Sequence, residues 1–157
     1  MKFEFCYVGK TKESYLKEGI EVYTKRLKHY CTFSEVCIPD IKNGGKLKSD
    51  QLKVKEGEEL LKRLNKEDCL VLLDEKGKRF TSVSFSKQIE RMMQMPYKRI
   101  VFQVGGAFGF SEAVYERANS KIALSEMTFS HQMIRLFFVE QLYRGFSIVR
   151  GEKYHNF

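Results

Sequence analysis

The sequence has no tryptophan, two prolines, three histidines and four cysteines among its 157 residues. The cysteines form no CxxC pair, and three histidines are too few to complete a usual metal-ligand set with them. We therefore expect no metal site. Cys6 and Cys69 lie inside apolar runs and are expected to be buried, reduced thiols, as in proteins of the cytoplasm, where disulfides rarely persist.

Long apolar runs and a secretory signal are also missing. No apolar run approaches the roughly 20 residues that a membrane-spanning helix needs, and the opening MKFEFCYVGK lacks a signal-peptide pattern. We expect a cytoplasmic protein with no membrane partner. The length of 157 residues fits one domain over 1–157, which can bury a core without disulfide or metal staples.

Acidic residues are outnumbered: 20 Asp and Glu stand against 28 Lys and Arg, which gives a net charge of +8 and a pI of about 9.3. The excess is spread along the chain, so no detachable basic tail explains it. Such a protein is attracted to polyanions, and nucleic acid is the first partner to test. Solvated, lysine-rich helix faces would give the same charge, so the charge alone does not define the chemistry.

Strand-like and helix-like segments alternate along the chain. Apolar and β-branched runs predict strands at 3–8, 33–38, 69–73, 99–104 and 121–124. Helical spacing predicts helices at 14–30, 51–64, 83–95, 111–119 and 131–146, with Ser111 as an N-cap. Residues 39–48 predict an exposed loop and residues 74–79 (DEKGKR) a turn. This order predicts an α/β fold with a mostly parallel sheet covered by helices on both faces.

The last predicted helix is apolar on most of its sides. The residues that give it this character are Met133, Ile134, Leu136, Phe137, Phe138, Val139, Leu142, Tyr143 and Phe146. In a small domain such a helix is either central to its own core or shared with a second subunit, and we favour a homodimer.

Three loops follow the carboxyl ends of predicted strands, where open parallel sheets bind their ligands: DEKGKR, GGAFGF and SEMTFSH. The glycine pair Gly105–Gly106 would let a ligand approach the backbone, although a plain strand-to-helix turn explains it equally well. SEMTFSH combines hydroxyls with the apolar Met127 and Phe129, as ligand pockets do. His131, just beyond, could be a base, a phosphate contact or a polar residue at a helix end.

The C-terminal residues 143–157, YRGFSIVRGEKYHNF, interleave aromatic rings with cations. Unstacked RNA bases lie on aromatic side chains while cations meet phosphates, so this pattern favours RNA binding. The alternative is that the rings merely pack the end of the chain against the domain.

The chain resembles the bacterial ribosomal RNA large subunit methyltransferase H family over essentially its whole length. The resemblance lies in an ordered set of motifs: V-G-K near the start, the glycine pair, M-T-F-x-H-Q-M-x-R, E-Q-x-Y-R and R-G-E-x-Y-H. It implies a homodimer with the SPOUT fold, an α/β domain whose C-terminal segment forms a trefoil knot; connection rules alone would predict an unknotted sheet. Phe108 and Ser130 depart from the family pattern without removing required chemistry.

The resemblance also implies S-adenosyl-L-methionine as the cofactor. By position, the residues that match the family's cofactor contacts are Leu73, Gly105, Leu124, Ser125, Glu126, Met127, Thr128 and Phe129. They belong to the same three loops that the sheet argument selects.

The implied reaction is methylation at N3 of a pseudouridine in 23S ribosomal RNA on the assembled ribosome. An in-line methyl transfer needs alignment and a route for the N3 proton, and no covalent nucleophile. We expect Tyr154 and His155 beside the base, delivered either by the same subunit or by the other one, and Arg135 and Arg144 on phosphate or on the uracil carbonyls. The full set of candidates is His131, Arg135, Tyr143, Arg144, Tyr154 and His155.

Two other functions fit parts of the sequence. A non-enzymatic RNA- or ribosome-binding factor would use the same basic surface and aromatic tail with a degenerate cofactor pocket. A nucleotide-dependent oxidoreductase would need a dinucleotide fingerprint, but GGAFGF is not GxGxxG and no acidic residue follows at the usual distance.

Overall fold

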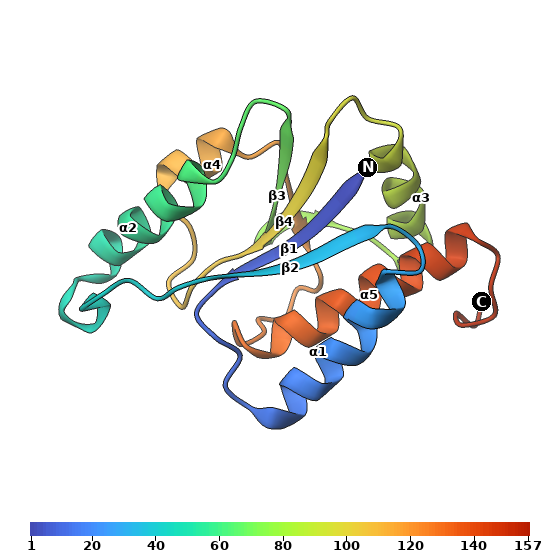
Figure 1. Cartoon of the computed structure of the whole chain (residues 1–157), viewed down its shortest axis with the longest axis horizontal. Helices are drawn as coiled ribbons and strands as arrows, with labels where there is room; N and C mark the ends of the chain where they lie inside the picture. Colours follow the sequence, from blue (N-terminus) through green and yellow to red (C-terminus); the bar gives the residue numbers. More distant parts are fainter.

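The computed structural model describes all residues from Met1 to Phe157 and contains one five-stranded sheet (Figure 1). All neighbouring strands are parallel, and the strand order is β2-β1-β4-β3-β5. The strands are β1 (Lys2–Val8), β2 (Thr32–Ile38), β3 (Asp68–Arg79), β4 (Arg99–Val104) and β5 (Ser120–Ala123). The predicted α/β class and parallel sheet are confirmed.

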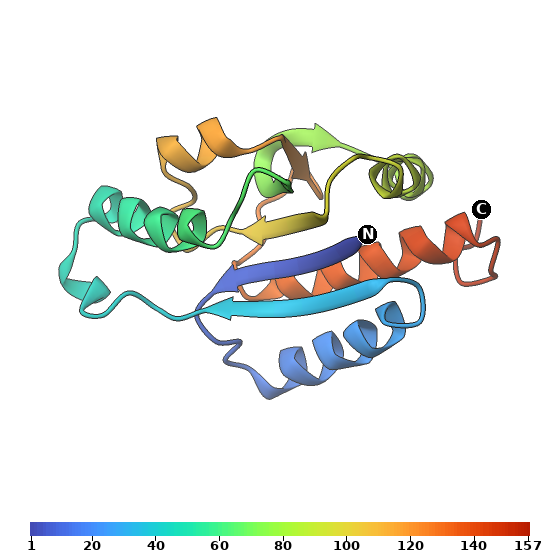
Figure 2. The same ribbon diagram turned by 45° about the horizontal axis from the view of Figure 1, so that its top comes forward.

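Helices cover both faces of the sheet, as predicted. The helices are α1 (Ser14–Leu27), α2 (Ser49–Lys62), α3 (Ser82–Met93), α4 (Glu112–Arg117) and α5 (Met133–Val149). Figure 2 shows α1 and α5 on one side of the sheet and α2 and α4 on the other. None of these helices combines the length and the hydropathy that a membrane-spanning segment requires.

The alternation of side chains along β1 builds two unequal cores. Phe3 and Phe5 point into a cluster of 20 buried residues that includes side chains of α1, α3 and α5. Cys6 and Val8 point to the opposite face, into a cluster of 8 that includes side chains of α2 and α4. Successive strand residues face opposite sides, so a continuous apolar run supplies both cores.

Helix α5 lies between α1 and α3 and buries most of its apolar surface inside its own chain. Phe138, Val139 and Leu142 are completely buried there, which explains much of the apolar character that predicted a subunit contact. Phe137, however, is 41% exposed and packs against Phe129 in a tilted arrangement, the ring centroids lying 5.1 Å apart. The homodimer therefore stays a prediction, supported by this outer pair of rings.

The structure corrects the predicted turn at residues 74–79. Strand β3 continues to Arg79, and its pairing with β5 is interrupted between Leu73 and Lys78, both of which register with Ile122. A Cβ at Gly77 would lie 2.6 Å from the backbone of Ile122, so only glycine fits this close approach. DEKGKR is thus an irregular strand segment in which Asp74 is buried, while the charged side chains after it face solvent and the backbone pairs with β5.

The other predicted elements are present with ends that differ by a few residues. The predicted helix 14–30 ends at Leu27, and the predicted loop 39–48 contains one short 3-10 turn at Gly44–Lys46. Ser111 caps α4 as predicted, its Oγ accepting the N–H of Val114 at 3.4 Å. The trefoil knot stays a prediction.

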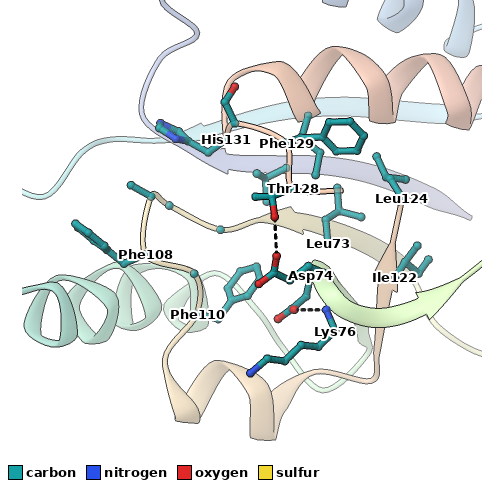
Figure 3. Close-up of a pocket in the computed structure, with 18 of the residues that line it drawn as sticks. Leu73, Asp74, Lys76, Phe108, Phe110, Ile122, Leu124, Thr128, Phe129 and His131 are labelled. Atoms are coloured by element: carbon teal, nitrogen blue, oxygen red, sulfur yellow. Dashed lines mark hydrogen bonds between the residues drawn. The ribbon is translucent and has the colours of Figure 1, made fainter. Parts of the chain in front are cut away.

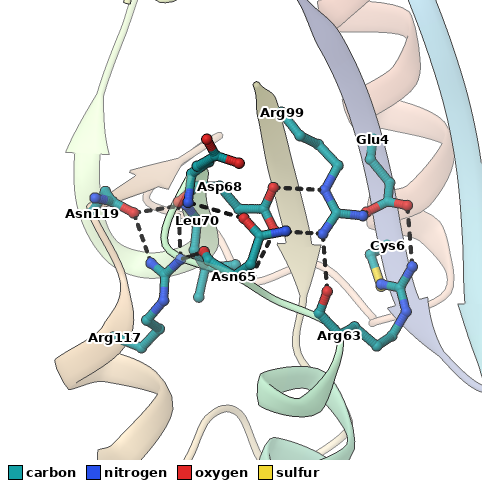
Figure 4. A network of polar contacts seen from close by, with 10 residues as sticks. Glu4, Cys6, Arg63, Asn65, Asp68, Leu70, Arg99, Arg117 and Asn119 are labelled. Atoms are coloured by element: carbon teal, nitrogen blue, oxygen red, sulfur yellow. Dashed lines mark hydrogen bonds and ion pairs between the residues drawn. The ribbon is translucent and has the colours of Figure 1, made fainter. Parts of the chain in front are cut away.

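A network of buried ion pairs ties the amino ends of the strands together (Figure 4). Arg99 at the start of β4 donates its Nε to Asp68 Oδ1 at 3.0 Å and lies 3.2 Å from Glu4 Oε2 through Nη1. Arg63, just after α2, donates to the other oxygen of Glu4 at 3.2 Å. Ion pairs therefore occupy the end of the sheet where the strands begin, and a ligand can bind at the opposite end, where the strands finish.

Candidate functional site

A cavity of about 610 Å³ opens at the carboxyl ends of β3, β4 and β5 (Figure 3). Its walls come from the three loops that the sequence singles out. The cavity brings together seven of the eight predicted cofactor residues: Leu73, Gly105, Leu124, Ser125, Met127, Thr128 and Phe129. Glu126, the eighth, is not part of the wall, and its carboxylate pairs instead with Arg79.

The wall combines apolar side chains with hydroxyls. Leu73, Ile122 and Leu124 form an apolar part at the strand ends (Figure 3). Thr128 donates its hydroxyl to Glu75 Oε2 at 3.0 Å, and Ser125 Oγ accepts the N–H of Met127 at 3.0 Å. The first contact ties the loop between β5 and α5 to the irregular part of β3, and the second is internal to that loop.

Residues 105–110, here called the glycine loop, form the opposite wall. A Cβ at Gly105 would lie 3.3 Å from both Gly109 Cα and Phe110 Cζ, so a side chain there would crowd the loop. Gly109 has φ of +85°, a backbone conformation that favours glycine. The loop therefore presents bare backbone to the cavity, and Phe108 stands exposed near its tip.

Sequence reasoning missed an acidic group in the cavity wall. Asp74 is 9% exposed and accepts the backbone N–H of Lys76 at 2.8 Å and the hydroxyl of Tyr115. Burial and the Asp74 carboxylate together raise the pKa of Tyr115, so its hydroxyl stays protonated as a donor. The available signal was an acidic residue directly after the apolar run 69–73. Its partner Tyr115 comes from α4, and a local sequence pattern does not identify that pairing.

His131 lies in the cavity wall just before α5. Burial lowers the pKa of its imidazole, and the positive charges of Arg135 and Lys12 lower it further. The neutral imidazole is therefore favoured at neutral pH, and it can accept a proton or a hydrogen bond.

Arg135 is buried within the chain and lines no part of the cavity, so the structure gives no support to the ligand-holding role predicted for it. The side chain is 1% exposed, and its guanidinium lies 4.1 Å from the centroid of the Tyr7 ring. Its donors go to the carbonyls of Val8 at 2.9 Å, Gly9 at 2.8 Å and His131 at 3.0 Å, and to Thr11 Oγ1 at 3.1 Å. With its donors engaged, Arg135 joins the end of β1 to the start of α5.

The other predicted catalytic residues cluster at the far end of α5. Glu140 Oε1 accepts both Arg144 Nη2 at 2.6 Å and the Tyr154 hydroxyl at 2.9 Å. Arg144 Nη1 lies 3.1 Å from His155 Nδ1, and its guanidinium lies 4.8 Å from the centroid of the Tyr154 ring. Tyr143 packs on Tyr154 with ring centroids 4.6 Å apart.

Within one chain this tail cluster lies apart from the cavity, and none of its residues is part of the cavity wall. Glu140 and Arg144, which contact Tyr154 and His155, lie roughly 10–17 Å from the start of α5 along the helix axis, at about 1.5 Å per residue. Figure 1 shows the C-terminus beyond the end of α5 that lies away from the carboxyl edge of the sheet. The structure thus divides the predicted site into a cavity with His131 and a distant tail.

Comparison with known proteins gives a consistent result. A sequence model described as "Predicted SPOUT methyltransferase" matches residues 1–155. The protein named ribosomal RNA large subunit methyltransferase H of Cytophaga hutchinsonii is 53% identical over 156 residues, covering 99% of this chain and 100% of the relative. Proteins of the same name from Parabacteroides distasonis and Flavobacterium johnsoniae are 54% and 51% identical, each with 99% coverage of both chains.

A family match of this extent accounts for the parallel sheet, the glycine loop and the cavity at the carboxyl edge together. A binding factor with a degenerate pocket does not account for a cavity formed by the matched loops. The chain belongs to the SPOUT methyltransferase family, enzymes that transfer a methyl group from S-adenosyl-L-methionine.

Proposed function

We propose that the protein methylates N3 of a pseudouridine in 23S ribosomal RNA on the assembled ribosome of the cytoplasm. The observation that carries the proposal is the cavity, where three loops far apart in the sequence converge. The relatives are named as methyltransferases of large-subunit ribosomal RNA, and the charge of +8 suits an RNA substrate.

The cavity fits the cofactor of the family. Its volume of about 610 Å³ lies within the range of roughly 300–1,000 Å³ that is usual for cofactor sites. Leu73, Ile122 and Leu124 suit an adenine ring, while the bare backbone at Gly105 and the hydroxyl of Ser125 suit the polar parts. When bound, S-adenosyl-L-methionine supplies a sulfonium methyl group to a nucleophilic nitrogen.

The residues of this chain then have to align the acceptor and manage its proton. N3 lies between two carbonyls, so a neighbouring imidazole or phenol can assist its deprotonation and a cation can stabilise the anion. His131 is placed at the cavity with a pKa lowered by burial, which favours the proton-accepting form. Tyr154, His155 and Arg144 provide a phenol, a second imidazole and a cation in one cluster.

A homodimer would bring the tail cluster and the cavity together. None of the tail groups lines the cavity of its own chain, whereas a partner can present its tail to that cavity. The exposed Phe137, which packs against Phe129 of the cavity wall, offers an apolar contact for that partner. The proposed site is therefore shared between two subunits.

Methyl transfer from labelled S-adenosyl-L-methionine tests the function. The substrates to compare are 70S ribosomes lacking the modification, separated 50S subunits and naked 23S RNA. We expect label in the large-subunit RNA of the 70S particle and little in naked RNA. Cofactor binding without label in any substrate would contradict the proposed acceptor, and failure to bind the cofactor would contradict the assignment of the cavity.

A further inference from the structure

Helix α2 packs a glutamate–glycine pair directly against the glycine loop. A Cβ at Gly57 would lie 2.6 Å from Ser111 Oγ and 2.9 Å from Val114 Cγ2, so the missing side chain lets α2 approach the start of α4. Glu56 directly precedes Gly57 on α2, and a Cβ placed at Gly106 would lie 2.7 Å from each of its carboxyl oxygens. The Glu56 carboxyl therefore lies against the backbone of Gly106.

Glu56 also lines a small pocket beside the glycine loop. This space has a volume of about 20 Å³, and its wall includes Glu56, Gln103 and Gly106. Glu56 Oε1 and Gln103 Oε1 are both buried without a hydrogen-bond partner in the chain, and Gln103 as a whole is 1% exposed. The Gln103 amide group is oriented by its Nε2, which donates to Val104 O at 2.9 Å.

Two buried acceptors from residues that line one small pocket require donors. The nearby cation Lys53 pairs with Asp50 at 3.3 Å and has no ion pair with Glu56. Burial raises the pKa of Glu56, and the negative charge of Asp40 raises it further, which shifts the carboxyl toward the neutral form that offers an O–H donor as well as an acceptor. A space of this size also holds one water molecule that can bridge polar atoms to the loop backbone.

We propose that Glu56 is a positioning residue for methyl-donor binding: with Gln103, its carboxyl forms a polar support beneath the glycine loop. The support holds Gly105 and Gly106 so that their bare backbone faces the main cavity. Glu56 itself does not line that cavity. This inference deepens the assignment of the cavity to S-adenosyl-L-methionine and rests on it.

Two measurements on the full-length protein test this role. In Glu56→Ala, we expect the Kd for S-adenosyl-L-methionine, by calorimetry, to rise about tenfold, equivalent to about 1.4 kcal/mol. We expect amides 105–110 to exchange hydrogen several-fold faster in the cofactor-free variant. With ribosomes as substrate, KM for the cofactor should rise while kcat at saturation stays unchanged.

Glu56→Gln and Glu58→Ala serve as the matched variants. Glutamine keeps the shape and the neutral donor and acceptor, so Glu56→Gln should stay within about threefold of wild type in both measurements. Glu58 is exposed on the same helix, and its replacement should change neither.

Three outcomes would overturn the inference. The first is that Glu56→Ala leaves loop exchange and Kd unchanged; the second is that exchange rises uniformly over the sheet; the third is that Glu56→Gln behaves like Glu56→Ala. If the wild-type protein itself failed to bind the cofactor, the proposed function would fall, while exchange in the cofactor-free protein would still decide the role of Glu56 in the loop.

Discussion

At the scale of single residues, Arg135 shows how a motif residue can serve the fold instead of the ligand. Its charge is buried against backbone carbonyls at the end of β1 and the start of α5. The second of these segments borders the site, since His131 lies in the cavity wall. The guanidinium thereby fixes the position of His131.

Replacing Arg135 should therefore lower stability. Arg135→Met fills a similar volume but leaves the carbonyls of Val8 and Gly9 buried without donors, and each unpaired group costs about 1–3 kcal/mol. We expect the free energy of unfolding, measured by urea denaturation, to fall by about 2–4 kcal/mol. Arg91→Met removes the same charge at an exposed position on α3, and it should change the free energy of unfolding by less than about 0.5 kcal/mol. Equal effects of the two substitutions would contradict this role.

Sequence reasoning could supply the residue types of the site but not the directions of their side chains. The place of Leu73 and Gly105 in the cavity could be predicted, because strand ends and glycine turns are visible in the sequence. Arg135 and Glu126 point elsewhere, which depends on which carbonyl or cation lies nearby in three dimensions. Asp74 gains its tyrosine partner only when α4 folds over β3.

At the scale of elements, the ion-pair network explains how the amino ends of three strands and the end of α2 are held together (Figure 4). Glu4 and Asp68 are almost completely buried on β1 and β3, and Arg99 on β4 lies between them. Arg117 adds hydrogen bonds from its Nη2 to the carbonyls of Asn65 and Asp68, at 2.9 Å each.

Asp68→Asn should weaken this network in a pH-dependent way. Burial acts to raise the pKa of Asp68, but hydrogen bonds from Arg99 and from the backbone of Asn65 outweigh it and lower the pKa. A depressed folded-state pKa gives stability that is present above the ordinary carboxyl pKa of about 3.9 and is lost as the pH falls through the folded value.

We therefore expect Asp68→Asn to lower the free energy of unfolding by about 2–4 kcal/mol at pH 7, because one partner of a buried pair is lost. The difference from wild type should shrink as the pH falls below about 4, in urea denaturation at a series of pH values. Asp50→Asn, at a 90% exposed side chain on α2, is the control and should show little change. A pH-independent loss would contradict the proposed contribution of the carboxylate charge.

The order and type of the helices and strands could be predicted because the apolar spacing is strong in each of them. The exception, residues 74–79, carries turn-forming and charged residues, and its strand character comes from pairing with β5. Such pairing depends on Ile122 and Ala123, which are more than 40 residues away in the sequence and invisible to a local pattern. The strand conformation of this segment therefore depends on tertiary pairing more than on local propensity.

At the scale of the whole molecule, the separation of cavity and tail predicts that two subunits share each active site. Gly105→Val should block the cavity, because a side chain there crowds Gly109 and Phe110. A second variant, with Tyr154→Ala and His155→Ala, removes the tail groups. Each alone should be inactive in methyl transfer while still forming dimers.

Mixing the two variants should restore activity. Random exchange makes half of the dimers mixed, and each mixed dimer has one cavity and one tail that are both intact and belong to different chains. We expect about a quarter of wild-type methyl transfer to return after subunit exchange. A mixture as inactive as its components would show that the tail acts on the cavity of its own chain.

The central claim is that this cavity and a tail cluster together methylate one nucleotide of the large-subunit RNA. The most direct measurement maps the labelled nucleotide by mass spectrometry after incubating the protein and labelled S-adenosyl-L-methionine with unmodified 70S ribosomes. We predict a single labelled position, a pseudouridine in 23S RNA with the methyl group on N3. Label on another base, on ribosomal protein or on small-subunit RNA would contradict the account.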